Sequence, residues 1–552
     1  MGLQLEVVSL RLKPSRQYAR IIVSVLAVSL CGLLGWFATR DVQKSLAVPK
    51  KVQEPQAPWK ATPTPVRASK RERDEFKDGS TVEVMASSRD QELILRFPSD
   101  ETYAAFLKAV EKTRVAVVDR LDRLRAMRVA FEHHEDLDAL LSGENITLYP
   151  AITRMPERIM PGTGVQENAV GFEDKVIEWL GVMGDHSLWG KGVKIAVLDS
   201  GVVPHESLST LTKSIAIEPF PSDFNLTHGH GTAVASLIAG NSRIAPGVAP
   251  SAEIVSIRVT NEAGVSDSFA ISAGLLSAMD EGVQIINVSM GSYEDSPLMA
   301  EAVWMVQNQG IVIVAASGND GQDDAAYPAA YPGVISVGAV DARGVQLDFS
   351  NYGEYLSLTA PGYMVNAAWP GNRYVRMSGT SMSAPLVTGA IAAAMSPGTG
   401  ERLSATEAAA LVMAYTDETG IPGPDSQYGS GILNLGRVMF RNVPGLLDAA
   451  ITNQRIVPIN QEASELQVTV QNRGTSTLIN TLVEMDTPLG LKKVNATTIA
   501  PGACQTFVVP IPADTPREQP FRVRTRVLLG MPGQDQTPQN NERTDILSLQ
   551  QS

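Results

Sequence analysis

The sequence predicts an α/β protein built on a doubly wound parallel sheet, with a small α+β domain before it and an all-β sandwich after it. From Lys191 to about Arg441, β-branched apolar runs alternate with helical stretches, as is typical of parallel strands covered on both faces. Ahead of them, shorter elements follow the order β-α-β-β-α-β. Beyond Pro444 the helix signal ends, and alternating strands are separated by turn residues.

Length and composition exclude several classes of protein. The chain has 552 residues, enough for three or four domains of about 100–200 residues. With 44% hydrophobic and 19% charged residues, it fits neither a disordered nor a polytopic membrane protein. A net charge of −13 argues against nucleic-acid binding, which needs a basic face. The only cysteines, Cys31 and Cys504, cannot build a disulfide scaffold or a multi-cysteine metal site, and neither suits a cysteine protease.

Residues 1–40 are predicted to direct the chain to a membrane. The apolar run Ile21–Ala38 would span roughly 27 Å as a helix, against a hydrocarbon core of about 30 Å. Four preceding cations predict a cytoplasmic N-terminus and export of the rest: Arg11, Lys13, Arg16 and Arg20. A signal anchor is favoured because Trp36-Phe37 is a poor approach to a cleavage site, but Ser45-Leu46-Ala47 keeps a cleaved signal peptide open. The mature protein would be periplasmic, on the cell surface or secreted.

Two segments precede the central sheet. Residues 41–80 are rich in Pro, Lys, Arg and Glu and are predicted to form a disordered tether. Residues 81–160 have the ferredoxin-like β-α-β-β-α-β pattern, with a Ser99 or Asp100 cap on the first helix. We expect strands at Val82–Val84, Glu92–Phe97, Val115–Val118, Met127–Phe131 and Ile146–Tyr149, and helices at Asp100–Lys112 and Glu135–Leu141.

The central domain is assigned to residues 170–445 and the sandwich to residues 450–552. The parallel strands are expected at residues 193–199, 253–259, 283–289, 311–317 and 334–340, and helices at Ser268–Glu281 and Pro297–Gln309. In such a sheet, reactive groups gather at the carboxyl ends of the strands. The sandwich strands are expected at Leu466–Val470, Leu478–Met485, Thr506–Ile511 and Phe521–Leu528. Cys504 is expected to be a buried small residue.

Two motifs carry an acid and an imidazole. In VLDSG (residues 197–201), Asp199 ends a buried strand, where a carboxylate needs a partner; a structural capping acid is the alternative. In HGHGTAVASLIAG (residues 228–240), His230 lies at the start of a helix of small and aliphatic residues. His228 and His230 suggest a zinc pair, but no HExxH helix or cysteine set completes a tetrahedral site.

A third motif carries a hydroxyl. In GTSMSAP (residues 379–385), Ser381 opens a helix rich in Gly and Ala, which places its side chain at the positive end of the helix dipole. Alone, such a serine reads as an N-cap. Together, Asp199, His230 and Ser381 supply the acid, base and nucleophile that hydroxyl-based covalent catalysis requires, each at the end of an element.

The chain resembles the subtilisin-family serine proteases (subtilases) from about Val176 to Arg441. The resemblance rests on these three motifs in the order Asp, His, Ser, and on YPAAYPGVISVGAVD at residues 327–341. It implies a subtilisin-like fold, with Asp199 as the orienting acid, His230 as the general base and Ser381 as the acylated nucleophile. An α/β-hydrolase is disfavoured, because that fold has GxSxG and the order Ser, Asp, His.

The resemblance also implies an oxyanion donor and a substrate groove. In AASGND (residues 315–320), Asn319 takes the oxyanion-hole position beside the Ser381 backbone N–H. An extended peptide substrate would pair with Ser289, Met290, Gly291 and Ser292, and the primary pocket would be bounded by Ala316, Ser317, Gly318 and Ala326. No cofactor is expected for catalysis. A structural calcium ion at Asp320, Asp323 and Asp324 is a weak alternative to a solvated acidic turn.

By the same resemblance, residues 81–160 are expected to be an inhibitory propeptide; an unrelated adaptor domain is the alternative. Its tail, Ile146 to about Met160, would lie in the active-site cleft and be cut by Ser381. The expected partners are therefore protein or peptide substrates, the chain's own propeptide, and a membrane through residues 21–38, with no nucleic acid. The sandwich resembles adhesion-type modules. A catalytically retired subtilase fold that serves as a binding module is the alternative to an exported, autoprocessed serine endopeptidase.

Overall fold

The computed structural model describes residues 92–141, 147–149, 166, 168–217, 229–261, 264–324, 326–396, 402–460, 463–516, 520–530 and 533–548. The predicted membrane segment Ile21–Ala38, the tether and the strand Val82–Val84 lie outside the described residues, as does most of the tail after Tyr149. Within the described ranges, every helix is too short or too polar to cross a bilayer.

The small N-terminal domain has the predicted β-α-β-β-α-β order. It consists of β1 (Glu92–Arg96), α2 (Asp100–Val110), β2 (Ala116–Leu121), β3 (Ala126–Ala130), α3 (His134–Leu141) and β4 (Thr147–Tyr149). The strands form one antiparallel sheet in the order β2-β3-β1-β4. Ser99 is the N-cap of α2, as predicted, and its Oγ accepts a hydrogen bond from Thr102 N at 3.2 Å.

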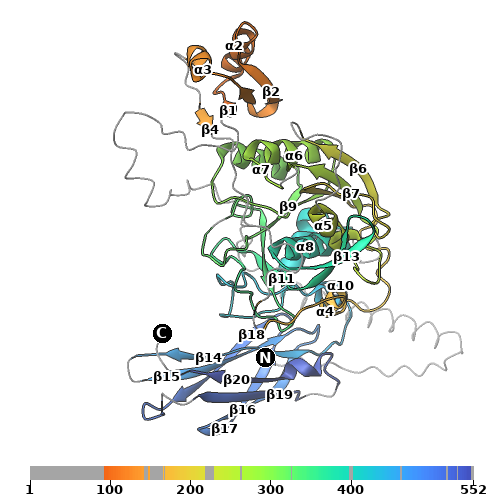
Figure 1. The fold of residues 1–552 in the computed structure, drawn as a ribbon. Coiled ribbons are helices and arrows are strands. Elements are labelled where there is room, and N and C mark those ends of the chain that lie inside the picture. Colours follow the sequence, from red (N-terminus) through yellow and green to blue (C-terminus); the bar gives the residue numbers. More distant parts are fainter. Residues whose placement is uncertain are drawn as a thin grey trace, which may run out of the picture. The chain divides into compact units, whose positions relative to one another are not determined.

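The central domain contains a parallel sheet of seven strands in the order β11-β10-β9-β8-β5-β7-β6. Of these, β6, β7, β9 and β11 are labelled in Figure 1. The strands are β5 (Lys194–Asp199), β6 (Leu211–Ala216), β7 (Glu253–Arg258), β8 (Ile285–Val288), β9 (Val312–Ala316), β10 (Ile335–Val340) and β11 (Leu358–Pro361). After β5 the chain runs to the edge strand β6 and returns to β7 beside β5, and from β8 it builds outward on the other side of β5. The reversal between β5 and β8 is the point where open α/β sheets place their sites.

Helices cover both faces of this sheet, as the uninterrupted apolar strands predicted. Ile195 and Val197 of β5 belong to one hydrophobic cluster, and Ala196 and Leu198 belong to a second. The first cluster includes α5 (His230–Ala239), α8 (Thr380–Ala394) and α9 (Ala405–Ala414); the second includes α6 (Ser268–Asp280) and α7 (Pro297–Asn308).

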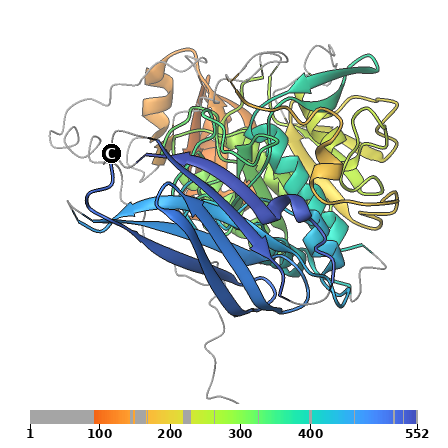
Figure 2. The same ribbon diagram turned by 90° about the horizontal axis from the view of Figure 1, so that it is seen from below.

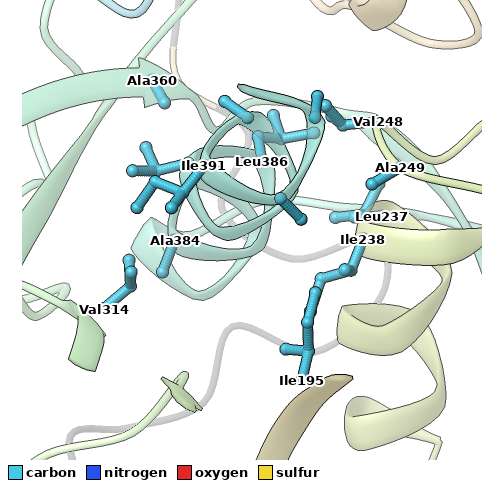
Figure 3. Close-up of a cluster of buried hydrophobic side chains, with 14 of the residues drawn as sticks. Ile195, Leu237, Ile238, Val248, Ala249, Val314, Ala360, Ala384, Leu386 and Ile391 are labelled. Atoms are coloured by element: carbon cyan, nitrogen blue, oxygen red, sulfur yellow. The ribbon is translucent and has the colours of Figure 1, made fainter. Parts of the chain in front are cut away.

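Helix α8 occupies the centre of the first cluster (Figure 3). Its Ala384 and Ile391 are fully buried and lie among side chains from β5, β9, β11 and the end of α5. The small residues of α8 allow this close packing. A Cβ added at Gly389 would lie 2.6 Å from the Val248 Cβ, so only glycine lets these segments approach.

The C-terminal part is an antiparallel sandwich, as predicted, of a sheet β14-β15-β18 and a sheet β17-β16-β19-β20 (blue in Figure 2). Its strands are β14 (Ala449–Pro458), β15 (Ser464–Asn472), β16 (Leu478–Thr487), β17 (Gly490–Ile499), β18 (Cys504–Ile511), β19 (Phe521–Leu528) and β20 (Glu542–Leu547).

The prediction that Cys504 is buried is wrong, because it begins β18 with its residue exposed. Exposed and buried positions alternate along that strand, and Cys504 falls on the outer face. Partial burial of its thiol nevertheless raises the pKa to about 11, so the group is protonated at neutral pH.

Candidate active site

The predicted catalytic side chains lie at the carboxyl edge of the parallel sheet. Asp199 is the last residue of β5, and Ser289 and Ser317 directly follow β8 and β9. Helices α5 and α8 begin at the same edge, with His230 as the first residue of one and Ser381 as the second residue of the other. The fold therefore brings the three motifs together from distant parts of the chain.

Asp199 and His230 form a buried, hydrogen-bonded pair. The His230 Nδ1 lies 2.8 and 2.9 Å from the two Asp199 carboxylate oxygens, and the carboxylate also accepts from Ser200 N at 2.6 Å. Asp199 is fully buried and His230 is 7% exposed. Because an ionised carboxylate only accepts hydrogen bonds, the imidazole carries its proton on Nδ1, which leaves the Nε2 lone pair free to accept a proton.

The start of α5 is pressed against the end of β5, and this fixes the imidazole above Asp199. The Ser200 Oγ accepts a hydrogen bond from Gly231 N at 3.1 Å. A Cβ at Gly231 would overlap the carbonyl oxygen of Gly201. Glycine at position 231 is therefore a steric requirement of the approach that forms the Asp199–His230 pair.

The Ser381 hydroxyl is held by Ser289 in this structure. Ser381 Oγ donates to the Ser289 carbonyl oxygen at 3.1 Å, and Ser289 Oγ donates to the Ser381 carbonyl oxygen at 3.0 Å. Among the hydrogen bonds of the described residues, none joins Ser381 to His230. Catalytic hydrogen bonds are often absent or long until substrate is bound, so this geometry is a resting arrangement of the hydroxyl.

Asn319 is oriented by the residue before the serine. Its Oδ1 accepts from both Thr380 N, at 2.8 Å, and Thr380 Oγ1, at 2.9 Å. With the amide oxygen occupied, Nδ2 is the group left to donate to a bound molecule. The sequence predicted the role of Asn319 but not that of Thr380, which orients Asn319 and is indistinguishable in the sequence from an ordinary residue at a helix start.

The predicted substrate-binding residues form two neighbouring buried segments. Ser292 pairs through its backbone with Tyr327, at 2.9 and 2.6 Å, and a Cβ at Gly291 would lie 3.3 Å from that of Ala326. On the other segment, Gly318 N donates to Thr380 Oγ1 at 3.3 Å. All eight predicted residues are buried: Ser289, Met290, Gly291, Ser292, Ala316, Ser317, Gly318 and Ala326.

The acidic turn beside Asn319 remains only a predicted calcium site. Asp320, Asp323 and Asp324 are exposed, and Tyr293 donates its hydroxyl proton to Asp320. Asn351 organises this turn by accepting from Asp320 N at 2.9 Å. Within the described ranges, no three His, Cys, Asp or Glu side chains converge as a metal-ligand set.

Comparisons with known proteins identify the family of the central domain. Residues 190–431 match the model of the Subtilase family, Peptidase S8. A thermostable alkaline protease of Halalkalibacterium halodurans is 36% identical over 255 residues, which are 46% of this chain and 69% of that protein. Subtilisin Savinase of Lederbergia lenta is 40% identical over 212 residues, which are 38% of this chain and 78% of that protein.

The fold is also found among solved structures. The epidermin leader peptide processing serine protease of Staphylococcus aureus superposes with a TM-score of 0.53 at 22% identity. The superposition covers 64% of this chain and 99% of that one. At this identity the likeness supports the fold alone.

Proposed function

Because the chain belongs to the subtilase family and is a serine endopeptidase, we propose that its catalytic groups are Asp199, His230, Ser381 and Asn319. The observation that carries this proposal is the buried Asp199–His230 pair, at 2.8 Å, on the edge of the sheet where α8 presents Ser381. A buried carboxylate that fixes one imidazole tautomer leaves Nε2 available as a base.

The reaction proceeds in two stages. Substrate binding draws Ser381 Oγ away from the Ser289 carbonyl; the hydroxyl gives its proton to His230 Nε2 and its oxygen bonds to the substrate carbonyl carbon. The oxyanion accepts hydrogen bonds from Asn319 Nδ2 and Ser381 N. His230 then gives the proton to the leaving amine as the C–N bond breaks. Water attacks the acyl-enzyme by the same route, which releases the acid and restores the Ser381 hydroxyl.

Substrate recognition is proposed for the two segments beside the serine. The backbone from Ser289 to Ser292 would pair with an extended peptide, and small residues at Ala316, Ser317 and Gly318 would leave room for varied side chains. Peptide and protein substrates are therefore recognised mainly through their backbone, with little selection among side chains.

A fluorophosphonate probe tests the catalytic assignment. We expect the purified wild-type protein to be labelled on Ser381, identified by peptide mass mapping, and His230→Ala to be labelled far more slowly. An unlabelled wild-type protein would instead favour the alternative, a retired protease fold that acts as a binding module.

We further propose that the small domain, predicted at residues 81–160 and described at residues 92–141 and 147–149, is an inhibitory propeptide, so that the protein is made as a zymogen. Its contacts with α6 and α7 support this. Arg128 is fully buried and lies 2.5 and 2.6 Å from the Asp267 carboxylate oxygens, and Arg123 pairs with Asp280 at 2.8 Å. Arg96 pairs with Glu301. In each pair the cation belongs to the small domain and the anion to the protease domain.

Autoprocessing would cut the chain within residues 146–160, and intact-mass measurement tests it. We expect wild-type protein to carry a mature N-terminus beyond that segment, and Ser381→Ala to keep the small domain attached. Identical N-termini in the two proteins would overturn self-processing.

We also propose that the precursor is exported and anchored through residues 21–38, in keeping with the apolar run and the cations before it. A single cut after the small domain would then release the protease from the membrane. Fractionation of expressing cells tests this: processed enzyme that stays in the membrane pellet at high salt would contradict it. The sandwich is proposed as a binding or spacer module.

A further inference from the structure

We propose that Asn287 and Thr388 are positioning residues for the Ser381 nucleophile, acting through Ser289. This inference rests on the catalytic role proposed for Ser381. The Ser381 carbonyl group is one that helix α8 itself cannot satisfy.

Pro385 creates that unsatisfied carbonyl. Within an α-helix, the carbonyl of residue 381 would accept from the backbone N–H of residue 385, but proline has no N–H. The Ser289 Oγ takes the vacant place and donates to the Ser381 carbonyl oxygen at 3.0 Å. The first turn of α8, and with it the nucleophile, is therefore tied to the residue that follows β8.

The Ser289 hydroxyl is itself fixed by a buried amide. Asn287 Nδ2 donates to Ser289 Oγ at 2.9 Å, and Asn287 Oδ1 accepts from Thr388 Oγ1 at 2.9 Å. Asn287 and Thr388 are fully buried and Ser289 is 3% exposed. Because the Ser289 Oγ accepts a hydrogen bond from Asn287 Nδ2, its own proton points to the Ser381 carbonyl oxygen.

The periods of strand and helix explain why these groups meet. Ile285 packs on the α8 side of the sheet and Ile286 on the opposite side, so Asn287 and then Ser289 face α8. On α8, Ser381 and Thr388 are seven residues apart and share one face, about two turns from each other. The strand therefore clamps the helix at two points, one of which is the nucleophile.

The clamp matters because the nucleophile must be aligned closely with the substrate carbonyl and with His230. A misplacement of about 1 Å can cost about 10²-fold in rate. We expect Asn287→Ala, which removes both hydrogen bonds, to lower kcat by between about tenfold and a hundredfold with KM within about twofold.

Thr388 offers a matched pair of variants. Thr388→Val keeps the side-chain shape but removes the hydroxyl, whereas Thr388→Ser keeps the hydroxyl but removes a methyl group. We expect kcat for a peptide amide to fall about tenfold in Thr388→Val, equivalent to about 1.4 kcal/mol of barrier, and to stay within about twofold in Thr388→Ser. Ser272→Ala, which removes a buried hydroxyl from α6 on the other face, should leave kcat unchanged.

The outcomes separate the two proposals. Full activity in Thr388→Val, or an equal loss of kcat in Thr388→Val and Thr388→Ser, would overturn the hydrogen-bonded clamp alone. A change confined to KM in Asn287→Ala would also overturn the positioning role of Asn287. If Asn287→Ala does not fold, the comparison of Thr388→Val with Thr388→Ser tests the positioning role instead. A wild-type protein that neither cleaves peptide nor reacts with fluorophosphonate would overturn the proposed function itself and the positioning role with it.

Discussion

The small domain and the sandwich contact the protease domain in different ways. Direct arginine–carboxylate pairs join the small domain to α6 and α7, and the Arg123–Asp280 pair is about half exposed. The sandwich is joined mainly through backbone groups: Gln471 accepts from Glu418 N at 3.1 Å and donates to Thr416 O at 3.4 Å. The first contact suits a partner that is released, the second a permanent neighbour.

One acidic residue centres the sandwich contact. Asp417 accepts from Arg437 at 3.3 Å, from Asn434 at 3.0 Å and from Arg473 of the sandwich at 3.0 Å. Arg437 is nine-tenths buried. Fixed charges are therefore used on both sides of the protease domain. At the sandwich, Arg437 and Arg473 also donate to backbone carbonyls, whereas on the other side Asp267 accepts from Ala270 N at 2.8 Å.

Breaking the Arg128–Asp267 pair should weaken the contact between the small domain and the protease domain more than any other change considered below. In the Ser381→Ala background, Arg128→Ala strands a buried carboxylate, and we expect the small domain to be held about 3–5 kcal/mol more weakly. Native-state hydrogen exchange of residues 92–141 measures this. The double variant R128M/D267N should recover most of the loss, because Asn still caps α6. Arg123→Ala should cost at most about 1 kcal/mol; equal losses in Arg128→Ala and Arg123→Ala would contradict the account.

Removing the Asp417 carboxylate should uncouple the unfolding of the sandwich from that of the protease domain. Asp417→Ala leaves Arg437 with backbone partners only, and we expect a loss of about 2 kcal/mol. In calorimetry, the sandwich and the protease domain should then melt as two resolved transitions. A single transition with unchanged midpoint would show that Asp417 does not couple the two domains.

The pH dependence of the sandwich should depend on Asp448. Burial raises the pKa of this carboxyl to about 6, above its ordinary value of about 3.9. The folded state therefore binds more protons between about pH 4 and 6, so stability falls as pH rises through that window and levels off above it. Asp448→Asn should remove this dependence and stabilise the protein at pH 8 by at most about 3 kcal/mol, measured by urea unfolding at pH 5 and 8. Identical pH profiles in the two proteins would exclude Asp448 as the source.

A change in salt concentration should produce the smallest difference between the two domain contacts. At 1 M NaCl the Debye length is about 3 Å, which screens the half-exposed Arg123–Asp280 pair and, less completely, the partly buried Arg96–Glu301 pair. We expect hydrogen exchange of the small domain to rise a few fold between 0.05 and 1 M NaCl, while exchange at Gln471 is unchanged. A larger rise in hydrogen exchange at Gln471 than in the small domain would contradict the view that the small-domain contact is the more electrostatic of the two.

The sequence was most informative where burial was deepest. Strands β5, β7, β8, β9 and β10 were predicted because their apolar runs are uninterrupted, and the end of β5 pointed to Asp199. The missed strands are β6, β11, β12 (Val365–Trp369), β13 (Arg373–Met377), β14, β17 and β20. Strands β6, β13, β17 and β20 bury few side chains and show little apolar alternation, whereas β11 is fully buried but has only four residues. Their identity depends on pairing with distant strands.

Candidate site residues divide in the same way. Asp199, His230, Ser381 and Asn319 were identified from motifs, but the groups that hold them were not, although Thr380 lies in the same motif as Ser381. Thr380 and Asn287 read as ordinary helix and strand residues, because their hydrogen bonds join segments far apart in the sequence. The Ser381–Ser289 bond likewise follows from the packing of α8 against β8, which no local pattern records.

The most direct test of the central claim is the rate of peptide-bond hydrolysis by the Ser381→Ala protein. The account predicts a kcat reduced by a factor on the order of 10⁶, the loss that removal of the serine causes in subtilisin, with the fold and substrate binding retained. A Ser381→Ala protein that cleaves peptide within tenfold of the wild-type rate would contradict it.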